Sequence, residues 1–261
     1  MQVPSFAVVG RPNKGKSSIV ATLSRDDSVY IDQRVGSTRK TQSFPMVIGD
    51  TTQYVLYDTP GMQRARTMLA WLEAHATDAS SRPATVRRFL EEHRDDERYD
   101  QECEMLMPIV EGAGIIYVVD GSCPFGPEYE PEMEILRWTG NPSLALINPI
   151  HNQDYIQDWQ NGLSQYFRTV RVFDAHHAEF RKQLDLLELF GHLDPQWRTA
   201  IDGAVQALRE ERGQQHRAAS AAISDMIVHA LQYCVSQKLV EGLPVEPVKT
   251  ALFSKYKTHL S

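Results

Sequence analysis

Cysteine is scarce in this chain, which has only Cys103, Cys123 and Cys234 among its 261 residues. Three thiols without metal-ligand spacing form neither an even disulfide framework nor a structural zinc site, so we expect reduced thiols in a cytoplasmic protein. Long apolar runs are also missing. A membrane-spanning helix needs about 18 or more consecutive apolar residues, so we expect no transmembrane segment and no signal peptide.

An excess of basic residues is absent as well. The net charge is −7, which argues against broad, nonspecific binding of nucleic acids but not against a local basic patch. Sequence repeats and low-complexity tracts are not visible. With 42% hydrophobic residues, the chain can fill one ordinary core and add a helical extension.

What the sequence does contain is a complete phosphate-loop pattern, GxxxxGK[ST], at residues 10–17. It lies between strand-like residues 6–9 and helix-like residues 18–23, where backbone N–H groups and a helix dipole can face phosphates. We predict that Lys16 reaches the β- and γ-phosphates and that the Ser17 hydroxyl binds Mg²⁺. The predicted nucleotide-binding residues of this segment are Asn13, Lys14, Gly15, Lys16, Ser17 and Ser18.

A second loop, Asp58-Thr59-Pro60-Gly61, follows the strand-like residues 53–57. At the end of a strand, Asp58 is suited to bind Mg²⁺ through water. The Gly61 N–H is suited to meet the γ-phosphate, so its loss on hydrolysis would be sensed here. Both residues are therefore predicted to bind nucleotide, and Gly61 is a candidate catalytic residue with Lys16.

These loops resemble those of the translation-factor-related GTPases, in particular the branch with Era and the tRNA-modification GTPase, which reads GRPNxGKS and DTPG. The resemblance implies a GTP-binding and GTP-hydrolysing switch with Mg²⁺ as cofactor. Between the loops, the run Gly36-Ser37-Thr38-Arg39 resembles switch I of that branch. By this alignment Thr38 binds Mg²⁺ and senses the γ-phosphate, which makes it a candidate catalytic residue, and Ser37 is the fallback.

The base-recognition loop departs from the family pattern Asn-Lys-x-Asp. Here the apolar residues 144–147 lead into Asn148-Pro149-Ile150-His151, which keeps the asparagine but lacks the lysine and the aspartate. A carboxylate that accepts from the base distinguishes guanine from adenine, so its absence predicts weaker selectivity. Asp154 is either a substitute or a helix N-cap. The resemblance also implies that Ala175, in Asp174-Ala175-His176, meets the base through its N–H.

The resemblance bears on catalysis in two ways. An asparagine at the place of Asn13 helps that branch bind a monovalent cation beside the phosphates, so Asn13 is a candidate catalytic residue and K⁺ ligand. Lys14 departs from the usual small or apolar residue and could compete with the cation. Met62 stands where other GTPases carry a water-orienting glutamine, while Gln63, Arg39 and Arg64 are weaker candidates for catalysis, with surface roles as alternatives.

The strand and helix patterns predict an α/β fold, a mostly parallel sheet with one antiparallel strand and helices on both faces, and the resemblance implies that this is the P-loop GTPase fold. We expect a hairpin of residues 44–48 and 53–57, strands at 115–119, 144–147 and 170–173, and helices near 130–138 and 155–167. The wider resemblance is to a bacterial family in which a GTPase domain is fused to a domain of unknown function. It rests on the Asn-Pro-Ile segment, residues 166–173 and residues 188–193.

We predict a GTPase domain at residues 1–176, a helical insertion at about 62–111 that extends switch II, and a C-terminal helical extension at 177–261. Tyr99, Cys103, Leu106 and Val110 form a helical stripe in the insertion. The insertion either packs permanently on the domain or moves with the nucleotide. In the extension, Gly191 is predicted to end one helix and Asp194 to cap the next.

The function that this reading favours is a GTP-hydrolysing switch with slow intrinsic turnover. The alternatives are a nucleotide-binding scaffold with negligible hydrolysis and an NTPase with relaxed base specificity. The expected partners are GTP and GDP, an unknown protein or RNA effector, and a second copy in a nucleotide-dependent dimer. Peripheral membrane contact through the lysine-bearing end, with Lys249, Lys255 and Lys257, is a further option, and a solvated face is its alternative.

Overall fold

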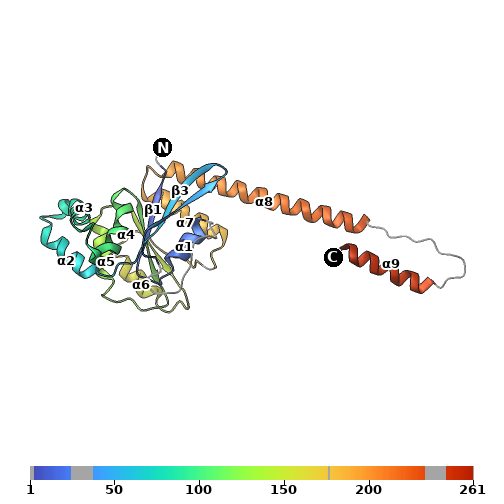
Figure 1. Ribbon diagram of the computed structural model, residues 1–261, viewed down its shortest axis with the longest axis horizontal. Coiled ribbons are helices and arrows are strands. Elements are labelled where there is room, and N and C mark those ends of the chain that lie inside the picture. The colour runs from blue at the N-terminus through green and yellow to red at the C-terminus, as the bar shows by residue number, and fades with distance from the viewer. Residues whose placement is uncertain (1–2, 25–37, 176, 233–244, 261) are drawn as a thin grey trace. The chain divides into compact units, whose positions relative to one another are not determined.

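The computed structural model describes residues 3–24, 38–175, 177–232 and 245–260. Its sheet has six strands in the order β2-β3-β1-β4-β5-β6. They are β1 (Ser5–Val9), β2 (Gln42–Ile48), β3 (Thr51–Asp58), β4 (Gly114–Asp120), β5 (Ser143–Asn148) and β6 (Val170–Val172). Strands β1 and β3 are labelled in Figure 1. Neighbouring strands are parallel except β2 and β3, which form the expected antiparallel hairpin. The predicted fold class is confirmed.

Helices connect and follow the strands. They are α1 (Lys16–Ser24), α2 (Ala65–His75), α3 (Arg82–His93), α4 (Asp100–Val110), α5 (Glu130–Trp138), α6 (Ile156–Leu163), α7 (Phe180–Leu193), α8 (Arg198–Gln232) and α9 (Val245–Leu260). Two short 3₁₀ helices, η1 (Ala79–Ser81) and η2 (Glu97–Tyr99), precede α3 and α4. The helix predicted near residues 130–138 matches α5, while α6 is shorter than predicted.

Both faces of the sheet are covered, because the central strands are apolar on both sides. Every residue of β4 is buried. On one face, side chains such as Ala7 and Ile115 belong to a core that includes residues of α2 to α6. On the other face, the Phe6 ring lies 4.5 Å from that of Phe190 in α7 and 5.0 Å from that of Trp197. Because β1, β3, β4, β5 and β6 are parallel, their carboxyl ends meet at one edge of the sheet.

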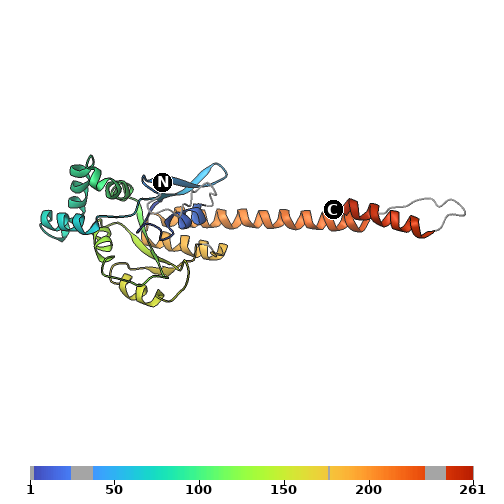
Figure 2. The same ribbon diagram turned by 60° about the horizontal axis from the view of Figure 1, so that its bottom comes forward.

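The predicted helical insertion consists of α2, α3 and α4, which gather on one side of the sheet in Figures 1 and 2. Asp78 accepts hydrogen bonds from the backbone of Ser80 and Ser81 and caps the turn that leads into α3. In α4, Cys103 and Leu106 of the expected stripe are buried. Burial, aided by nearby acidic groups, raises the pKa of Cys103 to about 11, so this thiol is neutral and unreactive at pH 7.

The chain divides into two compact units, residues 1–207 and 208–261. The prediction that Gly191 ends a helix is wrong, because α7 continues to Leu193. Gly191 is instead a contact point: a Cβ atom there would lie 3.4 Å from the side chain of Ile201 in α8. Asp194 does accept a hydrogen bond from the Gln196 N–H at 2.8 Å, just before α8 begins.

The second unit contains the rest of α8 and α9. The apolar residues Ile223 and Ile227 of α8 are 55% and 49% exposed. Cys234 lies outside the described residues. None of the helices in the described ranges combines the length and the apolar character needed to span a bilayer.

Candidate functional site

The phosphate-loop residues 10–17 connect the carboxyl end of β1 to the first residue of α1. Gly10 and Gly15 have φ angles of 142° and 86°, and Asn13 has a φ of 59°. A side chain at either glycine would be strained, and at Gly15 a Cβ atom would overlap the Asn148 amide group. The loop thus lies at the strand-to-helix junction that the sequence predicts.

Lys16 is 7% exposed, and its Nζ donates to the carbonyl oxygen of Arg11 at 3.0 Å. Burial lowers its pKa to about 8, and the carboxylates of Asp58 and Glu132 oppose this shift only in part. A buried ammonium group with so little compensating negative charge attracts an anion. Phosphate oxygens would supply the negative charge that the surroundings of Lys16 lack.

Asp58 ends β3 beside the phosphate loop. Its Oδ2 accepts hydrogen bonds from the Ser17 hydroxyl at 2.7 Å and from the Thr38 hydroxyl at 3.3 Å. Its Oδ1 is buried and has no hydrogen-bond partner among the residues that the structure describes. Burial raises the pKa of Asp58, although the Ser17 hydroxyl and the Lys16 charge act against it. The three predicted Mg²⁺ ligands therefore converge.

The DTPG loop packs directly on the phosphate loop. The Thr59 hydroxyl donates to the carbonyl oxygen of Val8 at 2.8 Å. A Cβ atom at Gly61 would lie 2.6 Å from Cδ of Pro12, so only glycine allows this approach. The predicted switch I run is described only in part, since Gly36 and Ser37 fall outside the described residues while Thr38 and Arg39 are within them.

Asn148 and Ala175 meet at the carboxyl end of β5. The Ala175 N–H donates to Asn148 Oδ1 at 3.2 Å, and the Ala175 carbonyl oxygen accepts from the Thr22 hydroxyl at 2.9 Å. Asn148 is 1% exposed, and within the described ranges its Nδ2 has no hydrogen-bond partner. The two residues predicted to face the base are thus adjacent, and both adjoin the phosphate-loop region.

The rest of the base loop offers no buried carboxylate. His151 and Asp154 are exposed. The suggestion that Asp154 caps a helix is wrong, because α6 begins at Ile156 with Tyr155 as its N-cap. The Asp154 N–H donates to the Asn152 side chain instead, at 3.1 Å. The aspartate that the sequence lacks at position 151 is therefore not replaced by another buried carboxylate in the described part of this loop.

Residues 62–64 follow Gly61 closely. Met62 is buried, whereas Gln63 and Arg64 are exposed. The Gln63 side chain donates to that of Gln101 at 3.0 Å. Arg39, after Thr38, is exposed as well. These positions agree with the surface roles given as alternatives for Gln63, Arg39 and Arg64.

Sequence reasoning missed two ionic contacts of the phosphate loop. Arg11 donates through Nε to Glu132 Oε1 at 2.6 Å and through its terminal nitrogen to the Glu128 carbonyl oxygen at 2.6 Å. Its guanidinium carbon lies 4.1 Å from the ring centroid of Tyr129. Glu132 also accepts from the Tyr117 hydroxyl at 3.1 Å. The only sequence signal was a charged Glu132 beside the apolar residues of α5.

The second contact involves Lys14. Its Nζ lies 3.4 Å from Asp120 Oδ2 and 3.6 Å from Cys123 Sγ. Burial lowers the pKa of Lys14, but the nearby Tyr129, Asp120 and Cys123 outweigh that effect and leave it raised. The unusual lysine of this loop is therefore charged and paired with the end of β4.

Comparisons with known proteins agree with this arrangement. A sequence model of the family described as "50S ribosome-binding GTPase" matches residues 5–149, and one of a domain of unknown function, DUF3482, matches residues 160–260. GTPase Der of Lawsonia intracellularis is 33% identical over 80 residues, which is 31% of this chain and 17% of that protein. GTPase Era of Rickettsia bellii is 31% identical over 81 residues, which is 28% of this chain and 27% of that protein.

These matches span well under two thirds of each relative's length. Among solved structures, a variant of Aquifex aeolicus Era bound to GDP.AlF4⁻ aligns with a TM-score of 0.48 and 16% identity, over 72% of this chain and 56% of that one. The family match itself extends from β1 to the residue after β5 and contains the phosphate loop, the DTPG loop and Asn148. Since that match covers more than half of the chain, the chain belongs to this GTPase family, and the DUF3482 match follows it.

Proposed function

We propose that this GTPase is a Mg²⁺-dependent molecular switch with slow intrinsic turnover, in which Ser17, Thr38 and Asp58 hold the metal ion. One observation carries the proposal: both hydroxyls point to the same Asp58 oxygen, and the other oxygen of that carboxylate is buried without a partner in the described part of the chain. Hard oxygen donors of this kind suit Mg²⁺, which is usually held by few side chains, water and phosphate.

The donor set fits the ion chemically. A bound Mg²⁺ would neutralise negative charge on the phosphates during transfer to water. Lys16 would add a second positive charge at the same phosphates, and burial keeps it free of bulk water. The Gly61 N–H and Thr38 are the proposed sensors of the γ-phosphate, since each adjoins the phosphate loop or Asp58.

We propose slow turnover because no glutamine directly follows Gly61. Met62 is buried directly after Gly61, where a glutamine would orient the water in other GTPases. Gln63 is exposed and bonded to Gln101. We propose that K⁺ bound near Asn13 supplies further positive charge, because Asn13 is exposed in the loop and Lys14 is paired with Asp120.

The experiment measures GTP turnover against Mg²⁺ concentration for wild type, Ser17→Ala and Asp58→Ala, with Ser164→Ala as a matched control. Ser164 is exposed and lies at the end of α6, far along the chain from the loops. We expect each site variant to need about tenfold more Mg²⁺ or to lose turnover, because an oxygen contact to the ion is removed. An unchanged Mg²⁺ requirement in both site variants would contradict the assignment.

A second candidate function is an NTPase with relaxed base choice. It is favoured by the exposed His151 at the position where the family carries an aspartate. The scaffold alternative, with negligible hydrolysis, predicts tight nucleotide binding and no turnover above that of Lys16→Ala. The effector is proposed to be a protein or an RNA that binds one nucleotide state, and co-purification with GTP-locked and GDP-bound protein would identify it.

A further inference from the structure

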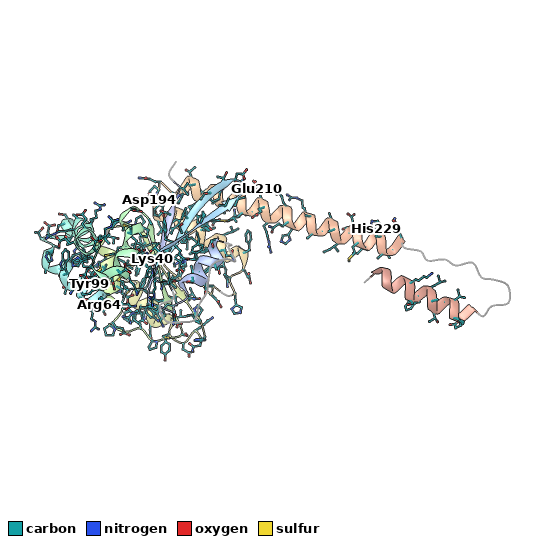
Figure 3. The ribbon with its side chains drawn as sticks, in the orientation of Figure 1. Lys40, Arg64, Tyr99, Asp194, Glu210 and His229 are labelled. Atoms are coloured by element: carbon teal, nitrogen blue, oxygen red, sulfur yellow. The ribbon has the colours of Figure 1, made fainter. Side chains whose placement is uncertain are left out.

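Helix α4 contacts both segments that flank the nucleotide site. Its residues Glu102 and Glu104 each accept hydrogen bonds from a different one of these segments. Lys40 and Arg64, labelled in Figure 3, mark the two segments, and Tyr99 marks the start of α4. Neither glutamate is part of the phosphate-loop or DTPG patterns.

Glu102 holds the segment after the DTPG loop. Its Oε1 accepts from the Gln63 N–H at 2.8 Å and from the Arg64 N–H at 2.6 Å. These amides come just before α2, where the first N–H groups of a helix lack partners within the helix. Glu102 is 1% exposed, so its charge is withdrawn from water and is compensated by these N–H groups and the helix dipole.

Glu104 holds the segment after switch I. Its Oε2 accepts from the Thr41 N–H at 3.1 Å, and its backbone carbonyl oxygen accepts from the Thr41 hydroxyl at 2.7 Å. Thr41 is three residues after Thr38 and directly precedes β2. Two hydrogen bonds to one residue fix both the position and the direction of the chain at that point.

The helix that carries these groups is itself anchored. Leu106 and Ile109 of α4 are fully buried in the core shared with β1, the strand that leads into the phosphate loop. The last turn is held by Asn141, whose Nδ2 donates to the Ile109 carbonyl oxygen at 2.7 Å. Both switch segments are thus tied to an element that packs on the strand leading into the phosphate loop.

We propose that Glu102 and Glu104 are positioning residues for hydrolysis, which hold Gly61 and Thr38 in place for the γ-phosphate. The insertion is then part of the catalytic apparatus and not an appended module. Held at both segments, the sensors pay less ordering entropy when they close on the γ-phosphate. This inference rests on the proposed γ-phosphate sensing by Thr38 and Gly61.

The test measures kcat, KM, and the affinities for GDP and for a nonhydrolysable GTP analogue. The variants are Glu102→Ala, Glu104→Ala, Glu102→Gln and Glu104→Gln, with Glu111→Ala as the matched control at the exposed end of α4. We expect the alanine variants to lose about tenfold in kcat and in the ratio of analogue to GDP affinity, because lost hydrogen bonds misplace only the γ-phosphate sensors. Glutamine keeps an acceptor oxygen, so the glutamine variants should recover most of both quantities.

Thr41→Val tests the contact between α4 and the segment after switch I without changing either glutamate. It removes one donor from a half-buried surface residue and leaves both glutamates in place. We expect it to lower the same affinity ratio as Glu104→Ala. If the GDP and analogue affinities fall equally, or if folded variants keep the wild-type ratio and kcat, the proposal is overturned.

The affinity ratio separates this inference from the proposed function. A wild-type protein that binds both nucleotides but shows no Mg²⁺-dependent turnover would contradict the proposed function, and the ratio would still decide the role of the two glutamates. Normal Mg²⁺-dependent turnover in every variant, with an unchanged ratio, would contradict only the positioning role.

Discussion

The ammonium nitrogen of Lys16 lies 3.0 Å from the carbonyl oxygen of Arg11, within the same phosphate loop. The side chain of Arg11 forms an ion pair with Glu132, and this pair holds the residue whose neutral carbonyl oxygen contacts Lys16. A carbonyl oxygen offers only a partial charge to a buried ammonium group. Phosphate oxygens carry negative charge, so we expect Lys16 to bind them in partial exchange for the Arg11 carbonyl oxygen. This exchange leads to two predictions about Lys16.

The first is that Lys16→Ala abolishes nucleotide binding or hydrolysis and leaves the fold intact. Loss of a charge-assisted contact should cost about 1.5 to 3 kcal/mol, or at least about tenfold in affinity. Titration with a fluorescent GTP analogue measures the affinity, and thermal unfolding without nucleotide controls for the fold. Unchanged affinity and turnover would reject the role of Lys16 at the phosphates.

The second concerns pH. Burial lowers the pKa of Lys16 to about 8, below its ordinary 10.5, so the free protein loses this proton as the pH rises through about 8. Phosphate binds the protonated form, and therefore affinity should be constant below about pH 8 and fall by up to about tenfold per pH unit above it. In the same window, from about 8 to 10.5, the unfolded chain binds more protons, so this group makes the nucleotide-free fold more stable as pH rises.

The control for this pH dependence is Lys14→Ala. The pKa of Lys14 is raised, so its charge does not change near pH 8, and the variant should keep the decline in affinity. Affinity for the GTP analogue that is flat from about pH 7 to about pH 9 in wild type would show that Lys16 stays fully charged and would contradict the prediction.

A third prediction is that guanine is preferred over adenine, but by less than the 10⁴-fold or more typical of sites with fully paired polar groups. The described base loop offers Asn148 and the Ala175 N–H but no buried carboxylate. Competition of GTP with ATP and XTP measures the preference. A ratio above about 10⁴ would contradict weak selectivity, and tighter binding of ATP would contradict the guanine preference itself.

A fourth prediction is that potassium stimulates hydrolysis. Positive charge beside the phosphates is a large term in catalysis, and Asn13 is the proposed ligand of the cation. Turnover in potassium chloride should exceed turnover in sodium chloride at equal ionic strength, and Asn13→Ala should remove the difference. Lys14→Ala should keep the difference between the two salts or enlarge it, since the ammonium group of Lys14 is paired with Asp120 and is not a ligand of the cation. Equal wild-type rates in the two salts would reject the cation mechanism.

A fifth prediction concerns amide hydrogen exchange in the insertion. Protection between about Arg64 and Val110 should differ between the GTP-analogue and GDP states, most strongly near Arg64, whose amide Glu102 ties to the anchored helix α4. Residues of α6, which lie outside the insertion, serve as an internal reference. Identical protection in both states would favour an insertion that is permanently packed on the domain.

Local patterns were enough to predict the strands, the hairpin and α5, because each depends on the periodicity of its own residues. The phosphate loop and the DTPG loop were predictable from short residue motifs that directly follow a strand. Their convergence on Asp58 followed from strand order, since parallel strands end at one edge.

Other parts of the site could not be read from the sequence. Arg11 and Glu132 are 121 residues apart in sequence, and Thr41 and Glu104 are 63 apart. Such pairs depend on how whole elements pack, which no local pattern encodes. The prediction that Gly191 ends a helix failed because a glycine that suits a helix end also suits a close contact between helices.

Asn148 touches both halves of the nucleotide site with one amide group. Its oxygen accepts from Ala175, and its nitrogen lies against Gly15 of the phosphate loop. From the proposed roles of these loops, we expect a substitution at Asn148 to change phosphate binding together with the choice of base. We therefore expect that phosphate binding and base choice cannot be changed independently through Asn148.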